Sequence, residues 1–196
     1  PITKNESHLI YNTADSINRL YKKYFEPLYS LQMLDFSAIN TLKEVDLTQI
    51  SFVSRRITDQ LNQVVSAFNV PVEAKFGSCE FDTKFGKVGV FGHDNHKIEG
   101  KYCLSVDLGG NDIYSGNISS SIFKDMPISI LLDFGGDDNY SEVSGHGKLA
   151  SGIFGVSILW DHDGDDMYET SGAGIASAFL GCALLIDENG DDFYIC

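Results

Sequence analysis

The sequence predicts a mainly β protein, a parallel β-solenoid of about 26–28 residues per coil with an N-terminal α-helical cap region. Three observations lead to this fold class. Helical periodicity is confined to the part of the chain before Phe76, glycine and acidic residues become frequent after that point, and one acidic pattern then occurs four times at near-constant spacing. Repeats of such a fixed period are typical of stacked units that share one core.

The composition allows a folded domain and restricts its partners. The chain has 196 residues, of which 43% are apolar, and it carries a formal charge of −14. All of this net charge falls in residues 76–196, which hold 6 basic and 20 acidic side chains. Because nucleic acids and anionic membranes bind basic surfaces, neither is expected as a partner, and a cation is the more natural counterpart.

Targeting and cysteine patterns add little. No run of about 18 apolar residues predicts membrane insertion, and the first residues lack the apolar stretch of a signal peptide. A start at Pro1 suggests a processed product or an excised fragment. The cysteines form no CxxC or CxxxC pair, which excludes a zinc ribbon and leaves disulfide formation open. They are Cys79, Cys103, Cys182 and Cys196.

Residues 1–75 are predicted as a helical region. Apolar residues recur at helical spacing in TADSINRLYKKYFEPLYSLQML and in DLTQISFVSRRITDQLNQVVSAF, while DFSAINTLKEVD between them is a short helix or a loop. Pro27 kinks or ends the first helix, and Asn69, Val70 and Pro71 end the second. We expect these helices to cover the first coil of the solenoid; a helix that binds a partner is the alternative. The apolar positions are Ile17, Leu20, Tyr21, Tyr24, Phe25 and Leu28, then Ile50, Val53, Ile57, Leu61, Val64 and Val65.

Residues 76–196 are predicted as the solenoid domain. It begins with an irregular first coil, residues 76–100, and continues with repeats that start at residues 101, 128, 156 and 182. Four segments share the pattern DxxG(D/N)DxY behind an apolar, strand-like run. They are YCLSVDLGGNDIYSG, ISILLDFGGDDNYSE, VSILWDHDGDDMYET and CALLIDENGDDFYIC. Their lead aspartates, Asp107, Asp133, Asp161 and Asp187, recur at this same near-constant period.

Stacking of these coils predicts ladders of identical residues. Equivalent residues of successive coils lie about 4.8 Å apart in a parallel sheet. The ladders expected in the core are Leu131, Leu159 and Leu185, and Tyr114, Tyr140, Tyr168 and Tyr194. Four glycines are expected in the turns, in backbone conformations that residues with a side chain rarely adopt. They are Gly110, Gly136, Gly164 and Gly190.

The same stacking creates an electrostatic problem at the acidic turns. Two like charges about 4.8 Å apart repel by about 3.5 kcal/mol at an effective dielectric near 20. Three interpretations follow. The lead aspartates accept hydrogen bonds from backbone N–H groups of their own turns, the paired acids that follow point into solvent, or the turns bind a cation.

Calcium is the cation that these residues favour. Carboxylate, amide and carbonyl oxygens are hard ligands, which select Ca²⁺ over zinc or copper. DHDGDD and DENGDD place oxygen ligands at alternate positions, but the glutamate at position 12 of an EF-hand is missing, so an EF-hand is excluded. The candidate metal ligands are Asp107, Asn111, Asp112, Asp133, Asp137, Asp138, Asp161, Asp163, Asp165, Asp166, Asp187, Asn189, Asp191 and Asp192.

Catalytic patterns are weaker than the repeat. GHDNHK brings His93, Asp94 and His96 together as a weak candidate for a metal or acid/base site, and no GxSxG, HExxH or P-loop is present. Glycosidic cleavage needs two carboxylates in different environments, whereas a repeat gives every coil the same one. A polysaccharide-binding or polysaccharide-cleaving β-helix enzyme therefore remains the alternative to a non-enzymatic module.

The acidic segments resemble a set of bacterial repeat proteins of the form GVGLLLDxGGDDxY. GVSILWDHDGDDMY and GCALLIDENGDDFY are the most similar, and the resemblance covers roughly residues 84–196. It implies a solenoid and an extracytoplasmic setting, and it implies no activity. We therefore predict a secreted or cell-surface structural, adhesive or assembly module whose acidic turns bind Ca²⁺. Its expected partners are a second copy bound end to end, or a surface polysaccharide or protein.

Overall fold

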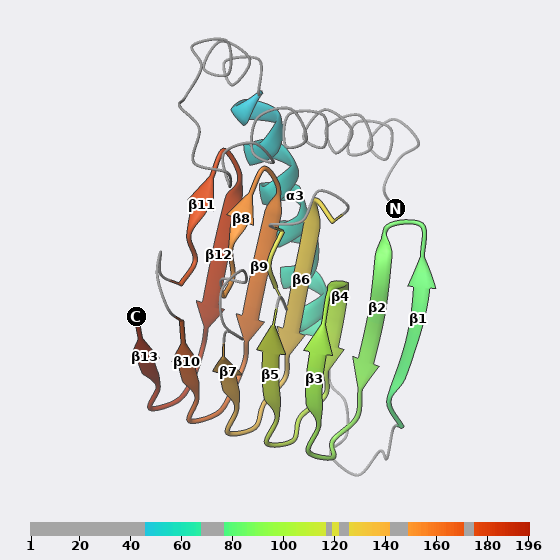
Figure 1. Cartoon of the computed structure of the whole chain (residues 1–196), viewed down its shortest axis with the longest axis vertical. Coiled ribbons are helices and arrows are strands. Elements are labelled where there is room, and N and C mark those ends of the chain that lie inside the picture. Colours follow the sequence, from blue (N-terminus) through green and yellow to red (C-terminus); the bar gives the residue numbers. More distant parts are fainter. Residues whose placement is uncertain (1–45, 68–76, 117–118, 122–125, 142–148, 171–174) are drawn as a thin grey trace, which may run out of the picture.

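The computed structural model describes residues 46–67, 77–116, 119–121, 126–141, 149–170 and 175–196 (Figure 1). These residues form one helix, α3 (Leu47–Ala67), and thirteen strands in three sheets. The helix predicted around Ile17 to Leu28 lies outside the described residues. The protein is mainly β, with parallel sheets, as the sequence predicts.

The strands form a large, a medium and a small sheet. The six-stranded sheet has the order β1 (Cys79–Thr83), β2 (Gly86–Phe91), β4 (Tyr102–Asp107), β6 (Ile128–Asp133), β9 (Val156–Asp161) and β12 (Cys182–Asp187). The five-stranded sheet has the order β13 (Phe193–Ile195), β10 (Met167–Glu169), β7 (Asn139–Ser141), β5 (Ile113–Gly116) and β3 (Lys97–Gly100). The third sheet pairs β11 (Ala178–Phe179) with β8 (Gly152–Ile153). All pairs are parallel except β1 with β2, which are antiparallel.

The strand register confirms the predicted ladders. In the six-stranded sheet, Leu131 pairs with Leu159, and Leu159 pairs with Leu185. The lead aspartates also pair with one another, Asp107 with Asp133 and so on to Asp187. In the five-stranded sheet, the tyrosines form one row, Tyr114, Tyr140, Tyr168 and Tyr194.

The main core lies between the six-stranded and five-stranded sheets. Three of the four tyrosines are at most 1% exposed, and they pack with Leu131 and Leu159. Successive tyrosine rings stack with centroids 4.6, 4.7 and 4.8 Å apart and with interplanar angles of 8° or less. This spacing agrees with the predicted separation between coils. The tyrosine rings of paired strands therefore stack with the same spacing as the strands themselves.

Helix α3 packs on the opposite face of the six-stranded sheet. Asp46 caps the helix by accepting hydrogen bonds from the backbone N–H groups of Thr48 and Gln49. The apolar stripe of α3 contacts the sheet side chains that point away from the main core. The stripe consists of Ile50, Ile57, Leu61 and Val65, and the sheet side chains include Ile130, Leu132, Ile158 and Trp160.

This position differs from the predicted one over the first coil. Every residue of β9 is buried, so the strand needs cover on both faces, and α3 supplies it on the outer face. The edge of the six-stranded sheet at the first coil is occupied by β1, which turns back on β2 through a hairpin. A strand, and not the described helix, therefore protects that edge.

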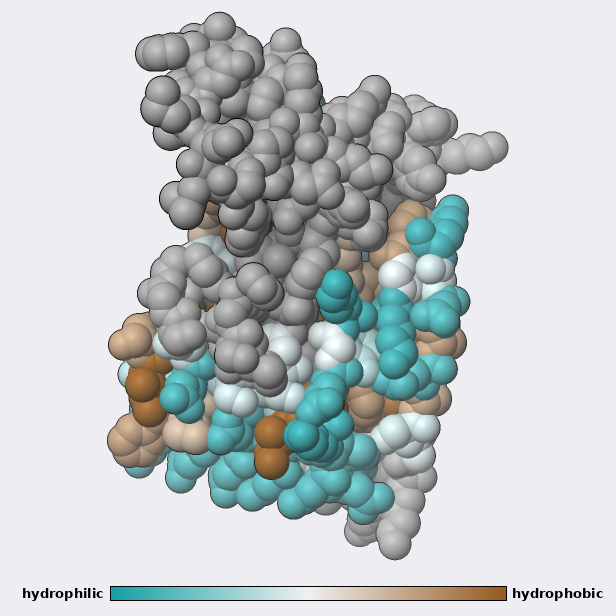
Figure 2. All heavy atoms as spheres, viewed as in Figure 1, coloured by the Kyte–Doolittle hydropathy of each residue, from teal (hydrophilic) through white to brown (hydrophobic). Residues whose placement is uncertain are grey.

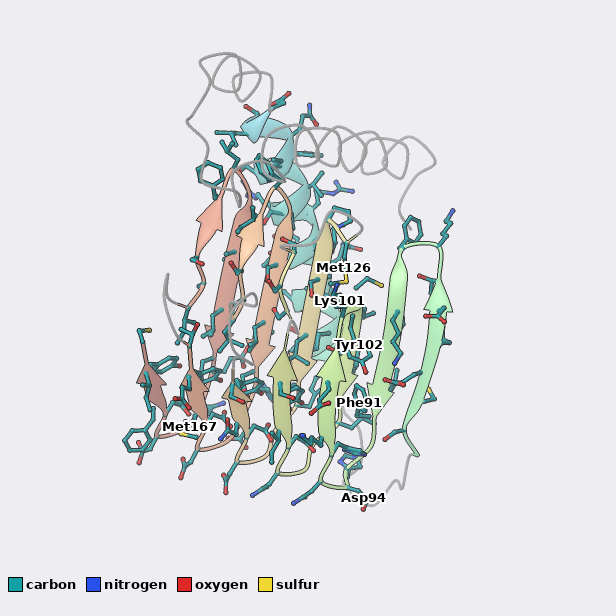
Figure 3. The ribbon with its side chains drawn as sticks, viewed as in Figure 1. Phe91, Asp94, Lys101, Tyr102, Met126 and Met167 are labelled. Carbon is teal, nitrogen blue, oxygen red and sulfur yellow. The ribbon has the colours of Figure 1, made fainter. Side chains whose placement is uncertain are left out.

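The predicted irregular first coil contributes regular strands to both sheets. β2 pairs with β4 so that Phe91 lies opposite Asp107, and β3 pairs with β5 so that Ile98 lies opposite Tyr114. Phe91 packs edge-on against Tyr102, at 5.9 Å between ring centroids, close to where the first turn begins (Figure 3). β2 and β3 thus pair as the later strands of the two sheets do, with apolar residues in place of the lead aspartate and the tyrosine.

Candidate functional site

Four acidic turns connect the six-stranded sheet to the five-stranded sheet and lie side by side at one end of both (Figure 1). Figure 2 shows hydrophilic side chains gathered along this end. The acidic turns are Asp107–Tyr114, Asp133–Tyr140, Asp161–Tyr168 and Asp187–Tyr194. Each turn begins with its lead aspartate. We call the acid two residues before its tyrosine the second aspartate: Asp112, Asp138, Asp166 and Asp192.

Six of the fourteen predicted metal ligands are exposed on the outside of the turns. Some of them make hydrogen bonds from turn to turn: Asp137 Oδ1 accepts from the Asp165 N–H at 3.1 Å, and Asp165 Oδ1 accepts from the Asp191 N–H at 2.9 Å. The interpretation that acids face solvent fits these six residues. They are Asn111, Asp137, Asp163, Asp165, Asn189 and Asp191.

Three of the four lead aspartates are buried, and two of these accept a hydrogen bond from their own turn. Asp107, Asp133 and Asp161 are at most 2% exposed. The Gly109 N–H donates to Asp107 Oδ1, and the Gly135 N–H donates to Asp133 Oδ1, each at 3.1 Å. The predicted turn hydrogen bond is therefore confirmed in the first two turns. Asp161 Oδ1 is buried without a hydrogen-bond partner.

The tyrosine hydroxyls join the lead aspartates of neighbouring turns. Tyr114 Oη lies 2.9 Å from Asp107 Oδ2 and 2.5 Å from Asp133 Oδ2. Tyr140 repeats this arrangement, at 2.8 Å from Asp133 Oδ2 and 2.5 Å from Asp161 Oδ2. A phenol has one proton to donate, so each tyrosine satisfies one of its two carboxylates. The second contact requires a proton on a carboxyl group or a cation nearby. The constant spacing from lead aspartate to tyrosine was the sequence signal for this contact.

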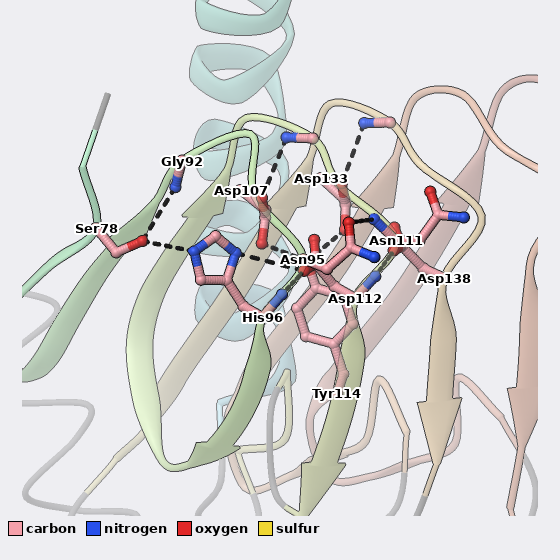
Figure 4. Close-up of polar contacts among 12 residues, drawn as sticks. Ser78, Gly92, Asn95, His96, Asp107, Asn111, Asp112, Tyr114, Asp133 and Asp138 are labelled. Atoms are coloured by element: carbon pink, nitrogen blue, oxygen red, sulfur yellow. Dashed lines mark hydrogen bonds and ion pairs between the residues drawn. The ribbon is translucent and has the colours of Figure 1, made fainter. Parts of the chain in front are cut away.

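Three of the four second aspartates are buried, so the interpretation that these acids point into solvent is wrong for them. Asp112, Asp138 and Asp166 are at most 3% exposed. Side chains alternate along a strand, so a residue two positions before a buried tyrosine faces the same interior. Each second aspartate accepts a hydrogen bond from the backbone of the previous turn. Asp138 Oδ1 accepts from the Asp112 N–H at 2.6 Å (Figure 4). Asp166 Oδ1 accepts from the Asp138 N–H at 2.7 Å.

The remaining carboxylate oxygens are left without partners. The Oδ2 atoms of Asp112, Asp138 and Asp166 are buried and accept no hydrogen bond. Burial, together with the neighbouring Asp133 carboxylate, raises the pKa of Asp138 to about 10. Burial and the same carboxylate raise the pKa of Asp161 to about 9 and that of Asp107 to about 8. These groups are therefore electrostatically unfavourable as anions without a counter-charge.

A histidine is the basic partner of the first of these buried acids. His96 Nδ1 lies 3.4 Å from Asp112 Oδ1, and the His96 backbone N–H also donates to this oxygen. On sequence alone His96 had only a weak role, because GHDNHK looks like an isolated loop. An alignment of FGHDNHKI with DLGGNDIY would have shown this role, because it places His96 at the position of the second aspartate Asp112.

The buried acids form three clusters that could hold a metal ion. In each cluster, one ligand atom from each of three residues lies within 4.8 Å of the other two. Metal–oxygen bonds of about 2.3–2.6 Å span separations of this size. The first cluster is His96, Asp107 and Asp112, the second is Asp133, Asp138 and Asp161, and the third is Asp166, Asp187 and Asp192. Eight of the fourteen predicted ligands thus come together in clusters, and the six exposed residues do not.

The chain matches no known protein family, no curated protein and no solved structure. Among the described residues, no helix has the length and apolar character needed to span a membrane.

Proposed function

We propose that this protein is a non-enzymatic structural or adhesive module, a parallel β-solenoid whose acidic turns bind Ca²⁺. One observation carries the proposal: successive turns each bury a lead and a second aspartate in the same register. The paired acids are Asp107 with Asp112, Asp133 with Asp138 and Asp161 with Asp166. Such a row needs protons or cations to become neutral, and a cation can bind the unpartnered oxygens of several turns at once.

The parallel ladders support the solenoid. Each strand of the six-stranded sheet from β4 onward pairs with the equivalent strand of the next repeat along the chain. The chain passes through the five-stranded sheet between these strands, and pairs there in the same order. Coils of one solenoid produce this order of neighbours, because each coil stacks only on the coil before it and the coil after it.

The ligand chemistry favours Ca²⁺ in the second and third clusters. All six residues of these clusters are aspartates, and hard oxygen ligands suit Ca²⁺ better than they suit soft metals. Mg²⁺ keeps several of its waters and requires shorter bonds, whereas the aspartates of the second cluster are at most 3% exposed. A buried, all-carboxylate site therefore fits the larger ion, which accepts protein ligands around most of its surface.

The burial of the acids also supports a binding role over catalysis. Cleavage of a polysaccharide requires a carboxyl pair that the substrate can reach. Here the second cluster lies inside the protein, and its members repeat the environment of neighbouring turns. A shallow depression on α3 is lined by residues outside the clusters, namely Leu47, Thr48, Ser51, Phe52 and Arg55.

The proposal includes a secreted or cell-surface setting and a binding surface for partners. Extracellular modules use calcium sites with dissociation constants of about 10⁻⁴–10⁻³ M, matched to the calcium outside cells.

In β13, Phe193, Tyr194 and Ile195 are 71%, 50% and 47% exposed. This apolar edge strand is the surface on which we place a second copy, or else a surface polysaccharide or protein. Sedimentation of the wild type and of Phe193→Asp tests the second copy, whose loss in the variant is the expected result.

Thermal unfolding with and without calcium tests the calcium sites. A ligand that binds only the folded state at 100 times its dissociation constant stabilises it by about 2.7 kcal/mol, which raises the melting temperature by roughly 5–10 °C. Asp138→Asn should abolish the part of this increase that comes from the second cluster, whereas Asp137→Asn should keep the whole increase, because Asp137 is exposed and outside the clusters. An unchanged melting temperature of the wild type across millimolar calcium would refute the calcium role.

A further inference from the structure

The first cluster differs from the third by one donor group. In the third cluster, the second aspartate of one turn, Asp166, meets Asp187 and Asp192 of the next turn. In the first cluster, His96 takes the place of that second aspartate and meets Asp107 and Asp112. The backbone confirms this equivalence: the His96 carbonyl accepts from the Ile113 N–H at 3.0 Å, as the Asp166 carbonyl accepts from the Phe193 N–H at 2.8 Å. The two clusters are the same site with an imidazole in one and a carboxylate in the other.

We propose that the first cluster is a zinc site, distinct in metal preference from the calcium sites proposed for the all-carboxylate clusters. Its donors would be His96 Nδ1 and one carboxylate oxygen each from Asp107 and Asp112. Imidazole nitrogen with carboxylate oxygen is a donor set that suits Zn²⁺ and other divalent transition metals, whereas Ca²⁺ prefers oxygen alone. The fourth position of a tetrahedral zinc ion remains for water or a ligand from outside the chain.

Unpartnered buried atoms point into this cluster. Asp112 is 1% exposed, and its Oδ2 atom accepts no hydrogen bond. His96 Nδ1 is also buried and without a hydrogen-bond partner, although it lies 3.4 Å from Asp112 Oδ1. Desolvated atoms of this kind cost free energy unless something binds them, and a cation between Nδ1 and the two carboxylates would bind them together.

Ser78 contacts the imidazole nitrogen that lies away from Asp112. Ser78 Oγ lies 2.8 Å from His96 Nε2 and accepts a hydrogen bond from the Gly92 N–H at 3.2 Å (Figure 4). With the ring proton on Nε2 donated to Ser78, Nδ1 presents its lone pair to the cluster. Histidine ligands of metals commonly donate their other ring nitrogen to such a partner, which fixes the tautomer and the ring orientation.

The surroundings limit the number of oxygen ligands. Phe91 stands opposite Asp107 in the register, so the first coil supplies no lead aspartate, and its ring lies 5.7 Å from the His96 ring. Two aspartates can offer at most four carboxylate oxygens, below the six to eight ligands of Ca²⁺. Zinc needs only four ligands in all. His96 keeps 21% of its side chain exposed, which leaves the ion a route from solvent.

Zinc titration of the metal-stripped full chain tests the site. We expect one strong Zn²⁺ site by calorimetry in the wild type, and at least a tenfold loss of Zn²⁺ affinity in His96→Asp, which makes the first cluster identical in composition to the third. His162→Gln is the matched control, because His162 pairs with Glu188 outside the clusters and should leave Zn²⁺ affinity unchanged. Equal Zn²⁺ affinity in His96→Asp and the wild type would overturn the proposal, and would identify the cysteines or other groups as the zinc ligands.

Two further measurements test whether the change in Zn²⁺ affinity comes from the His96 ring itself and whether the ring responds to zinc and not to calcium. Ser78→Ala keeps all three ligands and should reduce Zn²⁺ affinity about 10–100-fold. Nitrogen chemical shifts of the His96 ring in the wild type should move on Zn²⁺ addition and stay unchanged with Ca²⁺; shifts that do not respond to Zn²⁺ would contradict the proposal. The His96→Asp variant should still melt at a higher temperature with calcium. Failure of the zinc proposal and failure of the calcium proposal can therefore be distinguished.

Discussion

The backbone N–H of Asp112 donates a 2.6 Å hydrogen bond to Oδ1 of Asp138, the acid that occupies the same position in the next turn. The Asp138 N–H makes the same bond to Asp166, and the Asp166 N–H makes it to Asp192 at 3.0 Å. Each second aspartate is therefore a structural link between two turns through one oxygen, while its other oxygen remains available. The two roles of the carboxylate can be separated by mutation.

Replacing Asp138 tests the structural link. Asp138→Asn keeps an oxygen that accepts from the Asp112 N–H, and it removes a charge that burial disfavours, so metal-free stability should not fall. Asp138→Ala leaves that N–H buried without an acceptor and should cost about 1–3 kcal/mol in the free energy of unfolding. Urea unfolding in chelator measures the difference. Equal stability of the two variants would show that the hydrogen bond contributes nothing.

The raised pKa values predict that the metal-free protein loses stability as pH rises. Asp107, Asp138 and Asp161 have folded-state pKa values of about 8, 10 and 9, above the ordinary value of 3.8 that they have when unfolded. The unfolded chain therefore releases protons first, and the stability present below pH 4 is lost as pH rises toward 8–10. Melting temperatures in chelator should fall from pH 5 to pH 9. Asp138→Asn should reduce this slope, and a slope that is zero or positive in the wild type contradicts the assignment.

Removing one tyrosine hydroxyl tests the contacts between lead aspartates. Tyr140→Phe keeps the stacked ring but removes the hydroxyl that contacts Asp133 and Asp161. Hydrogen bonds to charged or buried acids contribute about 1.5–3 kcal/mol, and we expect a loss in this range. Tyr194→Phe is the control, because that side chain is 50% exposed and its hydroxyl bonds to Asp187. Denaturant titration should show the smaller loss for the control; equal losses would mean that burial of the hydroxyl does not matter.

The stacked turn glycines predict a severe defect for a single methyl group. Gly136 has φ +139°, and a Cβ atom added there would lie 1.5 Å from the Gly110 carbonyl oxygen. Gly136→Ala combines backbone strain with this clash and should cost roughly 3 kcal/mol or more. Gly77→Ala, where an added Cβ meets nothing within 4 Å, should change stability by less than about 0.5 kcal/mol. Comparable unfolding midpoints for the two variants would contradict the close approach.

The repeat pattern predicted the sheets, the ladders and the turn glycines, because identical residues at near-constant spacing must meet when parallel strands stack. The periodicity of residues 46–67 also predicted α3, but not its position. An amphipathic stripe shows that one face is buried and does not show against which surface. Here the outward side chains of β6 and β9 provide that surface.

The candidate site was predicted only in part. The pattern identified all eight clustered aspartates, but it grouped them with six exposed residues of the same chemical type. Strand alternation from the buried tyrosine separates the two groups, since Asp138 shares the face of Tyr140 while Asp137 does not. His96 was only a weak candidate from sequence, because the segment from Phe91 to its register partner Asp107 is much shorter than the later repeats, so a search at their period does not align it with the second aspartates.

The four stacked tyrosines make the protein a set of coupled chromophores. Parallel phenol rings 4.6–4.8 Å apart, held in a chiral row, interact when they absorb light, so their near-ultraviolet circular dichroism belongs to the row and not to single residues. The contribution of one ring pair to that signal is lost where its two turns separate, even if both keep their own strands. Near-ultraviolet circular dichroism of the tyrosines therefore reports, without an added label, whether neighbouring turns are stacked.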